Sequence, residues 1–123
     1  MHAIIDALNR GDVEAMLARM HPDFEWTPLE TSPVASVYRG REQVRRYVED
    51  WLSTFEGLRI NLEDLTHVGD QVIAVVHGQA RGRASGLTLG NRFCQVWTVR
   101  DTVALRVEEY ATAVEGFAAV RRS

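Results

Sequence analysis

The chain has 123 residues, of which 46% are hydrophobic and 25% are charged, and its formal net charge is −3. This length and composition fit one globular domain that spans residues 1–123. The 14 basic residues are all arginine and are mixed with acidic residues along the chain, so the sequence shows no basic stripe for binding nucleic-acid phosphates.

The sequence also argues against a membrane, a disulfide and a metal. Its longest apolar runs, such as VIAVV at 72–76, are far shorter than a membrane span, and residues 1–12 lack the features of a signal peptide. Cys94 is the only cysteine, and the four histidines show no metal-ligand spacing. We therefore expect a cytoplasmic protein without a metal or another cofactor, and without a nucleic-acid or membrane partner.

The first third of the chain predicts two short helical pieces and one strand. Ile4, Ile5 and Leu8 suggest a helical turn, and Asp12 can cap a second helix that carries Met16, Leu17 and Met20 on one side. In the stretch PDFEWTP at 22–28, apolar and acidic residues alternate between two prolines, which predicts a brief strand. A loop then leads to Gly40.

The rest of the chain predicts one long helix followed by four strands. Apolar residues recur at helical spacing from Arg41 to Phe55, and Gly57 is expected to close this helix. The predicted strands cover 58–67, 71–84, 87–99 and 103–111. Helices first and an antiparallel sheet after them indicate an α+β fold with helices on one face of the sheet.

Turn lengths decide which side chains share a sheet face. A two-residue turn at Ser85–Gly86 places Gly78 opposite Phe93 and His77 opposite Cys94. A three-residue turn at 100–102 places Gln95 opposite Val107 and Trp97 opposite Leu105.

With these turns, Glu109 joins the apolar inner face and Glu108 turns away from it. A two-residue turn at the second position would exchange the two glutamates, because a slip of one residue moves every side chain to the other face. We favour the three-residue turn, because it keeps the apolar residues together.

The order of elements and four stretches of sequence resemble the SnoaL-like branch of the nuclear-transport-factor-2-like superfamily, which includes polyketide cyclases and ketosteroid isomerases. The stretches are ALNRGDVEAMLARMHPDFEW at 7–26, YRGREQVRRYVEDW at 38–51, GRASG at 82–86 and VWTVRD at 96–101. The resemblance implies a cone-shaped α+β barrel, in which N-terminal helices pack on a strongly curved, mostly antiparallel sheet around a pocket. It also implies a homodimer through the outer sheet face.

The resemblance favours some reactions over others. The base and the oxyanion-hole residues of ketosteroid isomerases correspond here to Thr27, Ile4 and Gln95, none of which matches. Epoxide hydrolase relatives need an Asp–Arg–Asp set, and no arginine lies beside Gln95 on the inward face. The cyclase-like pattern of a polar residue and an acid fourteen residues later is met by Gln95 and Glu109, although the glutamine replaces a histidine.

We therefore single out Glu109 and Gln95 as candidate catalytic residues. Apolar neighbours would raise the pKa of Glu109 and suit it to move a proton at a carbon next to a carbonyl group, while Gln95 would donate to the developing enolate. The alternative is a glutamate that is solvated at the pocket mouth or paired with an arginine, with a structural role only.

The expected ligand is a small hydrophobic molecule. The side chains that we expect around it are Trp26, Tyr38, Tyr47, Trp51, Phe55, Phe93, Trp97 and Val107. The same residues are also compatible with a filled core. Two functions stay open: a cofactor-independent isomerase or cyclase, and a non-catalytic ligand-binding or dimerisation module.

Overall fold

The computed structural model describes residues 1–29 and 37–122, and its first elements are two short helices. Helix α1 (His2–Arg10) ends at Gly11, which has a φ of 70°, and helix α2 (Val13–Ala18) follows directly. The Asp12 side chain accepts a hydrogen bond from the backbone N–H of Ala15, which confirms the predicted cap. The buried side chains of both helices face the sheet core, among them Ile4, Leu8 and Met16.

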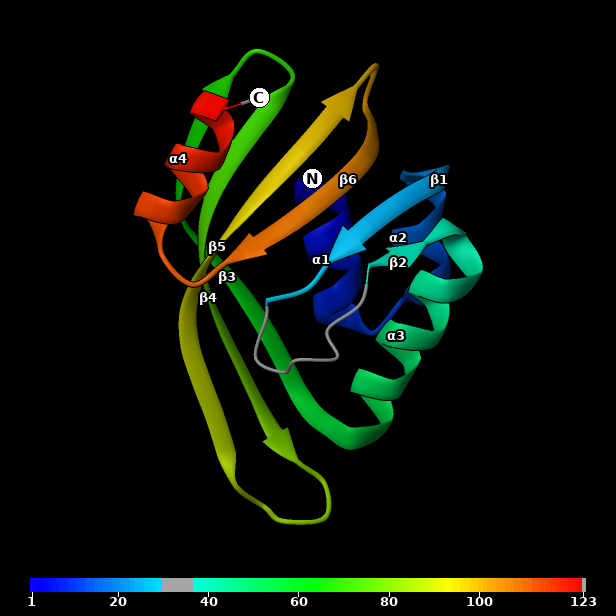
Figure 1. Cartoon of the computed structure of the whole chain (residues 1–123). Coiled ribbons are helices and arrows are strands. Elements are labelled where there is room, and N and C mark those ends of the chain that lie inside the picture. Colours follow the sequence, from blue (N-terminus) through cyan, green and yellow to red (C-terminus); the bar gives the residue numbers. More distant parts are fainter. Residues whose placement is uncertain (30–36, 123) are drawn as a thin grey trace.

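Six strands form one curled, unclosed sheet that wraps around the N-terminal helices (Figure 1). The strands are β1 (Met20–Thr27), β2 (Tyr38–Arg39), β3 (Phe55–Val68), β4 (Gln71–Gly82), β5 (Thr88–Arg100) and β6 (Val103–Tyr110), in the spatial order β2-β1-β6-β5-β4-β3. Every pair is antiparallel except β1 with β6. The predicted α+β architecture is confirmed.

The long helix α3 (Gly40–Thr54) packs against the inner side of the sheet through Val44 and Val48, which are both buried. The prediction for this helix is correct except at its end. Phe55 already has an extended backbone and begins β3, and Gly57 lies inside β3 with a φ of 64°. The first strand of the antiparallel part is therefore longer than predicted.

The β4–β5 hairpin pairs two residues away from the predicted register. Ala74 faces Gln95 and Val76 faces Phe93, because the loop contains the four residues 83–86, and the N–H of Gly82 donates to the carbonyl of Leu87 at 2.9 Å. His77 consequently faces Arg92. A shift of two residues preserves the faces, so the predicted inner set stays together.

The β5–β6 connection differs from the prediction in its turn length and in its register. Together the two differences leave each side chain from Arg106 onward on the predicted face of the sheet. Its turn has two residues, Asp101 and Thr102, and a register shift between Thr98 and Val99 then leaves one extra residue, Leu105, in β6. Gln95 thereby faces Glu109, and Glu109 points inward while Glu108 points outward, as predicted.

The start of β6 does not follow the predicted alternation. Ala104 belongs to the core, whereas Leu105 lies in a shallow surface hollow with Arg106. The prediction that Leu105 lies opposite Trp97 is therefore wrong, and Val107 takes that position. The register shift near this end of the hairpin is the physical reason.

A helix that the sequence analysis missed, α4 (Ala113–Arg122), covers part of the outer sheet face (Figure 1). Phe117 and Val120 of this helix pack on Ile73, Cys94 and Val96. Their spacing of three residues is a signal that could have indicated a helix. The homodimer through the outer sheet face stays a prediction, and helix α4 covers part of that face.

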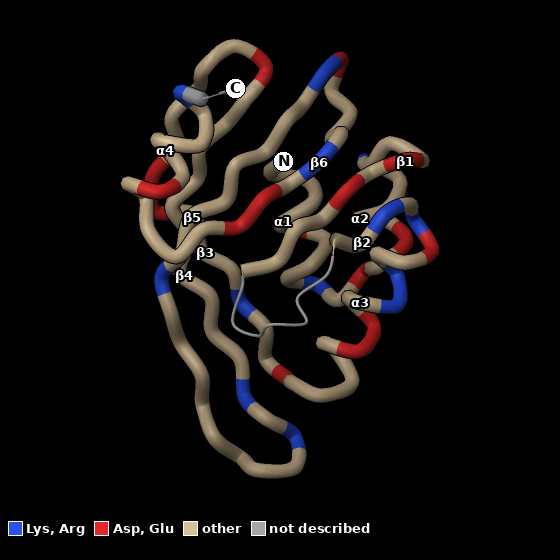
Figure 2. Tube along the Cα trace, viewed as in Figure 1, with Lys and Arg blue, Asp and Glu red and all other residues tan. Residues whose placement is uncertain are grey.

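Acidic and basic residues are interspersed over the described chain (Figure 2). No helix formed by residues 1–29 and 37–122 is long and apolar enough to cross a membrane.

Candidate functional site

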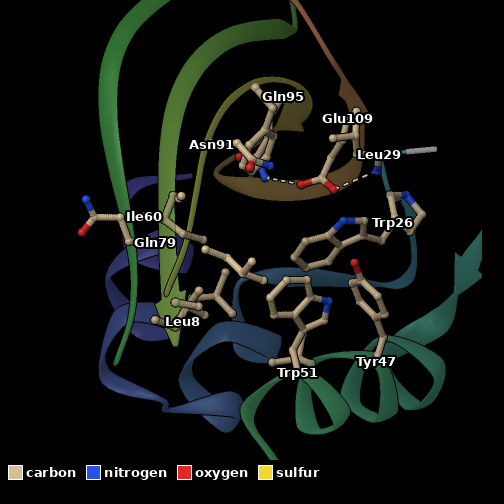
Figure 3. A pocket seen from close by; sticks show the side chains of 18 of the residues that line it. Leu8, Trp26, Leu29, Tyr47, Trp51, Ile60, Gln79, Asn91, Gln95 and Glu109 are labelled. Atoms are coloured by element: carbon tan, nitrogen blue, oxygen red, sulfur yellow. Dashed lines mark hydrogen bonds between the residues drawn. The ribbon is translucent and has the colours of Figure 1, made fainter. Parts of the chain in front are cut away.

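A cavity of about 580 Å³ lies between the inner sheet face and helix α3 (Figure 3). Two large apolar side chains of its wall are open to solvent, Trp51 at 37% and Leu89 at 48% exposure. The cavity therefore opens between α3 and β5. Glu109 and Gln95 lie at its other end, next to Trp26 (Figure 3).

Aromatic side chains form one wall of the cavity. The rings of Tyr38 and Tyr47 stack at 4.4 Å, and Trp26 meets the Tyr47 ring edge-on at 5.5 Å. Helix α3 presents Tyr47 and Trp51 on the same side because they are four residues apart. Such a wall suits a flat apolar ligand.

The Glu109 carboxylate is held by two hydrogen bonds from distant parts of the chain. Its Oε1 accepts from the backbone N–H of Leu29 at 3.0 Å, and its Oε2 accepts from Gln95 Nε2 at 2.8 Å. Burial raises the pKa of Glu109 above its ordinary value, and the Gln95 and Leu29 donors and the nearby Trp26 indole offset part of this rise. A carboxyl group in this setting can exchange a proton closer to neutral pH than an exposed one.

The orientation of Gln95 follows from a neighbour on the same strand. Trp97 Nε1 donates to Gln95 Oε1 at 3.1 Å, and an indole nitrogen can only donate. The Gln95 oxygen must therefore face Trp97, which leaves the amide nitrogen to face Glu109. Trp97, Gln95 and Glu109 form a chain of hydrogen bonds with one direction.

Two further polar groups lie near Glu109. Burial and the negative charge of Glu109 raise the pKa of Tyr47, so its hydroxyl stays protonated at neutral pH. Trp26 Nε1 is buried and has no hydrogen-bond partner among the residues that the structure describes. Trp26 itself is 5% exposed.

The structure brings most of the predicted site residues to the cavity wall. The predicted residues found there are Trp26, Tyr38, Tyr47, Trp51, Phe93 and, at the polar end, Gln95 with Glu109. The Phe55 ring lies tilted against the Trp51 ring, with the centroids 4.5 Å apart, and Phe55 is not part of the wall. Trp97 and Val107 are fully buried in the core and do not line the cavity either. Whether any of these residues binds a ligand or acts in catalysis stays a prediction.

Several wall residues were not singled out from the sequence. They include Leu8, Leu29, Leu58, Ile60, Leu89 and Asn91. Leu89 and Asn91 share the alternation of Phe93 along β5, so strand parity could have indicated them. No sequence signal indicates the backbone N–H of Leu29, which bonds a residue 80 positions away.

The cavity wall carries a single charged side chain, Glu109, among the described residues. The described part of the chain also holds no group of three or more histidine, cysteine, aspartate or glutamate side chains arranged around a common point. The chemistry that these residues can offer is therefore proton transfer and hydrogen bonding within an apolar space.

The sequence profile of a family described as a SnoaL-like domain matches residues 1–107. No curated protein matches the chain. Among solved structures, an NTF2-like protein from Burkholderia thailandensis E264 is 28% identical, with a TM-score of 0.77 over 97% of this chain and 92% of that one.

Two other solved structures share the fold at lower identity. TerC co-crystallised with polyporic acid is 23% identical, with a TM-score of 0.77 over 99% of this chain and 95% of that one. A hypothetical protein with a ketosteroid isomerase-like fold from Catenulispora acidiphila DSM 44928, in complex with trimethylamine, is 13% identical, with a TM-score of 0.79 over 89% and 82%. By its sequence match over residues 1–107, the chain belongs to the SnoaL-like domain family.

Proposed function

We propose that this protein is a cofactor-independent isomerase or cyclase that binds a small hydrophobic carbonyl compound in the cavity and moves a proton through Glu109. The observation that carries the proposal is the position of the Glu109 carboxylate. It is the one charged group on the described wall, it lies at the inner end of an aromatic cavity, and two hydrogen bonds fix it there.

The proposed chemistry is a proton transfer next to a carbonyl group. Glu109 takes a proton from the carbon beside the carbonyl, the C–H electron pair moves into the carbonyl group, and an enolate forms. In an isomerisation the enolate is conjugated, and the protonated Glu109 returns the proton to the γ-carbon of this dienolate. In a cyclisation the enolate carbon forms a bond to the carbon of a second carbonyl group, whose π electrons move to its oxygen, and Glu109 returns the proton to that alkoxide oxygen. A raised pKa supports this role, because a carboxylate with a higher pKa is the stronger base.

The comparisons support a small-molecule ligand at the level of the fold. TerC, which has the same fold, was co-crystallised with polyporic acid, and the protein from Catenulispora acidiphila is in complex with trimethylamine. Neither identity is high enough to transfer a ligand to this chain.

A second candidate function is a non-catalytic ligand-binding module. Gln95 favours it, because an amide holds Glu109 by a hydrogen bond but cannot relay a proton as a histidine can. This alternative uses the same cavity and the same aromatic wall. It differs only in predicting binding without turnover.

The two functions are separated by comparing the wild type with Glu109→Gln against aromatic polyketide-like compounds and small enones. Binding is followed by thermal shift, and turnover by NMR, including exchange of protons beside the carbonyl with deuterated water. We expect turnover of at least one compound by the wild type and a loss of about 100-fold or more in Glu109→Gln, since a positioned acid or base contributes on this scale.

The matched control is Glu108→Gln, one residue away on the outward face, where Glu108 accepts a hydrogen bond from the Tyr110 hydroxyl at 3.2 Å. We expect this variant to keep the wild-type rate. Equal turnover in the wild type and Glu109→Gln would remove Glu109 from the mechanism. Binding by the wild type without any turnover would support the binding module instead.

A further inference from the structure

The inner end of the cavity contains a hydrogen-bond donor that lacks an acceptor. Trp26 is 5% exposed, and its Nε1 atom has no partner among the described residues. Its indole lines the cavity, and the nitrogen edge of the ring faces the end where Glu109 lies (Figure 3). The Trp26 indole lowers the pKa of Glu109, yet no hydrogen bond of normal geometry joins the two groups, so the N–H is open to a better-placed acceptor.

The neighbouring polar groups already have partners. Gln95 uses its oxygen on Trp97 and its nitrogen on Glu109, and the Glu109 oxygens accept from Gln95 and from the backbone of Leu29. Gln95 was predicted to donate to a substrate oxygen, but in the structure it donates to Glu109. Trp26 Nε1 is the fully buried side-chain donor without a partner among the described residues, and it is free to donate to a ligand oxygen. The Tyr47 hydroxyl also lines the cavity and is a second polar group close to Glu109.

The charge of the wall limits the ligand. Among the described residues that line the cavity, Glu109 is the only charged one, and no arginine or histidine lies in the wall beside it. An anionic ligand would place a second negative charge in the same apolar space without compensation, which is unfavourable. A carboxylate or phosphate group inside the cavity is thus electrostatically unfavourable while Glu109 is ionised.

A cation is disfavoured by the same unpartnered donor. Aromatic rings and a carboxylate can together attract an organic ammonium ion. An ammonium group has no acceptor, however, so the Trp26 N–H would stay unsatisfied. A neutral carbonyl compound meets both requirements, because its oxygen accepts from Trp26 while the adjacent carbon lies beside Glu109.

We propose that Trp26 Nε1 donates to the carbonyl oxygen of the ligand, and that the cavity selects neutral carbonyl compounds over anions and cations of the same shape. This inference rests on the proposed function, because it assumes that the ligand occupies the Glu109 end of the cavity. It adds Trp26 as a catalytic residue that would stabilise the developing enolate.

A competing account keeps Trp26 purely structural. In that account the indole tilts slightly and donates to the Glu109 carboxylate, with no ligand involved. Removal of the N–H would then change the binding of a ketone and of an apolar compound of the same shape alike.

The test uses four probes that share the naphthalene ring system and differ in the attached group. They are 2-acetylnaphthalene, the near-isosteric 2-isopropenylnaphthalene, 2-naphthoate and 2-naphthylmethylammonium. Calorimetric titration of the wild type should show the ketone binding about tenfold more tightly than the alkene, the amount expected for one hydrogen bond in a dry site. Both ions should bind more weakly than the ketone.

The variant Trp26→Phe removes the N–H and keeps an aromatic ring. We expect its ketone-to-alkene preference to fall to about one, within the spread expected after loss of one hydrogen bond. Trp51→Phe makes the same change at the cavity mouth and should alter both neutral probes alike, keeping the preference. A preference retained in Trp26→Phe, or absent from the wild type, would overturn the inference.

A measurement on the wild type covers the case in which Trp26→Phe does not fold. The chain has three tryptophans, so a ¹⁵N-labelled sample should give three indole N–H signals. One of them, not that of the hydrogen-bonded Trp97, should move downfield with the ketone and stay in place with the alkene. Failure of all four probes to bind would contradict the proposed function as well, whereas equal binding of ketone and alkene would contradict this inference alone.

Discussion

At the inner end of the cavity, Gln95 can donate to Glu109 only while its own oxygen faces the Trp97 indole. The direction of the hydrogen bonds from Trp97 to Gln95 and from Gln95 to Glu109 decides which protonation state of Glu109 is stabilised. A carboxylate that accepts hydrogen bonds is favoured in its charged form, which limits the rise that burial produces in its pKa. Trp97, although outside the cavity wall, is therefore a positioning residue for Glu109.

We predict that Trp97→Phe raises the pKa of Glu109 further. Without the indole donor, the Gln95 amide is free to turn over and accept a hydrogen bond from protonated Glu109. The carboxyl ¹³C shift of Glu109, followed by NMR across a pH series, should have a higher midpoint in the variant than in the wild type. Trp51→Phe, which leaves the chain of hydrogen bonds intact, serves as the control, and an unchanged midpoint in Trp97→Phe would contradict the role assigned to Trp97.

Sequence reasoning identified Glu109 and Gln95 as inward-facing, because strand parity needs only the pattern of apolar residues. It could not show the partners of these side chains. The Leu29 contact is made by the backbone, and the Trp97–Gln95 contact depends on the angle between neighbouring side chains. The unpartnered Trp26 nitrogen is likewise a property of packing, which a pattern of residues does not contain.

At the scale of elements, the β5–β6 turn shows why the predicted register was wrong while the faces were right. Asp101 and Thr102 both have positive φ values, 53° and 65°, as in the two-residue turns that usually contain Asn-Gly. Threonine is a poor signal for such a turn. The register shift between Thr98 and Val99 is also invisible in the sequence, and it restores the inward direction of Glu109.

We predict that Thr102→Gly stabilises the protein by about 1 kcal/mol, because a β-branched residue is strained at positive φ and glycine is not. Urea unfolding measures the difference. The control Thr88→Gly, at the start of β5, should instead be destabilising, since glycine weakens a strand. A loss of stability in Thr102→Gly would show that this turn is not strained.

Helix α4 approaches the sheet closely at one glycine. A Cβ atom at Gly116 would clash with the Sγ atom of Cys94, which is fully buried on β5. In an unhindered helix, Gly→Ala is favourable by about 1 kcal/mol. Here the clash should dominate, because overpacking of a tight contact costs roughly 1–3 kcal/mol.

We therefore predict that Gly116→Ala is destabilising, and that much less stability is lost when the change is made in a Cys94→Ala background. Unfolding free energies of the two single variants and the double variant give the coupling between the two sites. A stabilising effect of Gly116→Ala on its own would mean that α4 does not lie against Cys94 in solution.

At the scale of the whole molecule, the order of elements was sufficient to predict the fold. Amphipathic spacing in 41–55 and alternating strands after it specify helices on one face of a curved sheet, and the match over residues 1–107 agrees. Helix α4 lies beyond the matched residues, and its few apolar side chains gave a weak pattern. The homodimer through the outer face stays a prediction, and sedimentation of the full chain measures it.

We predict that the contribution of Glu109 to the free energy of unfolding becomes less favourable as the pH rises. The pKa of Glu109 is raised in the folded state, so the folded protein holds this proton more strongly than the unfolded chain does. Its contribution is therefore most favourable below the ordinary glutamate pKa of about 4.3 and is lost as the pH rises through the folded-state pKa. Each unit of that rise corresponds to about 1.4 kcal/mol.

Urea unfolding of the wild type and Glu109→Gln, repeated over a pH series that starts near the ordinary glutamate pKa, measures this effect. The stability of the wild type relative to Glu109→Gln should decline with increasing pH. The outward-facing control Glu108→Gln should not reproduce the decline. A relative stability that rises with pH would have the wrong sign for a carboxyl group with a raised pKa.

The most direct test of the account is the titration of Glu109 itself in the wild-type protein. The carboxyl ¹³C signal is assigned by its absence from Glu109→Gln and followed by NMR across the pH range. The account predicts a midpoint above the ordinary glutamate value, as burial in the cavity requires. A midpoint at or below that value would show a solvated or ion-paired carboxylate and would contradict proton transfer by Glu109.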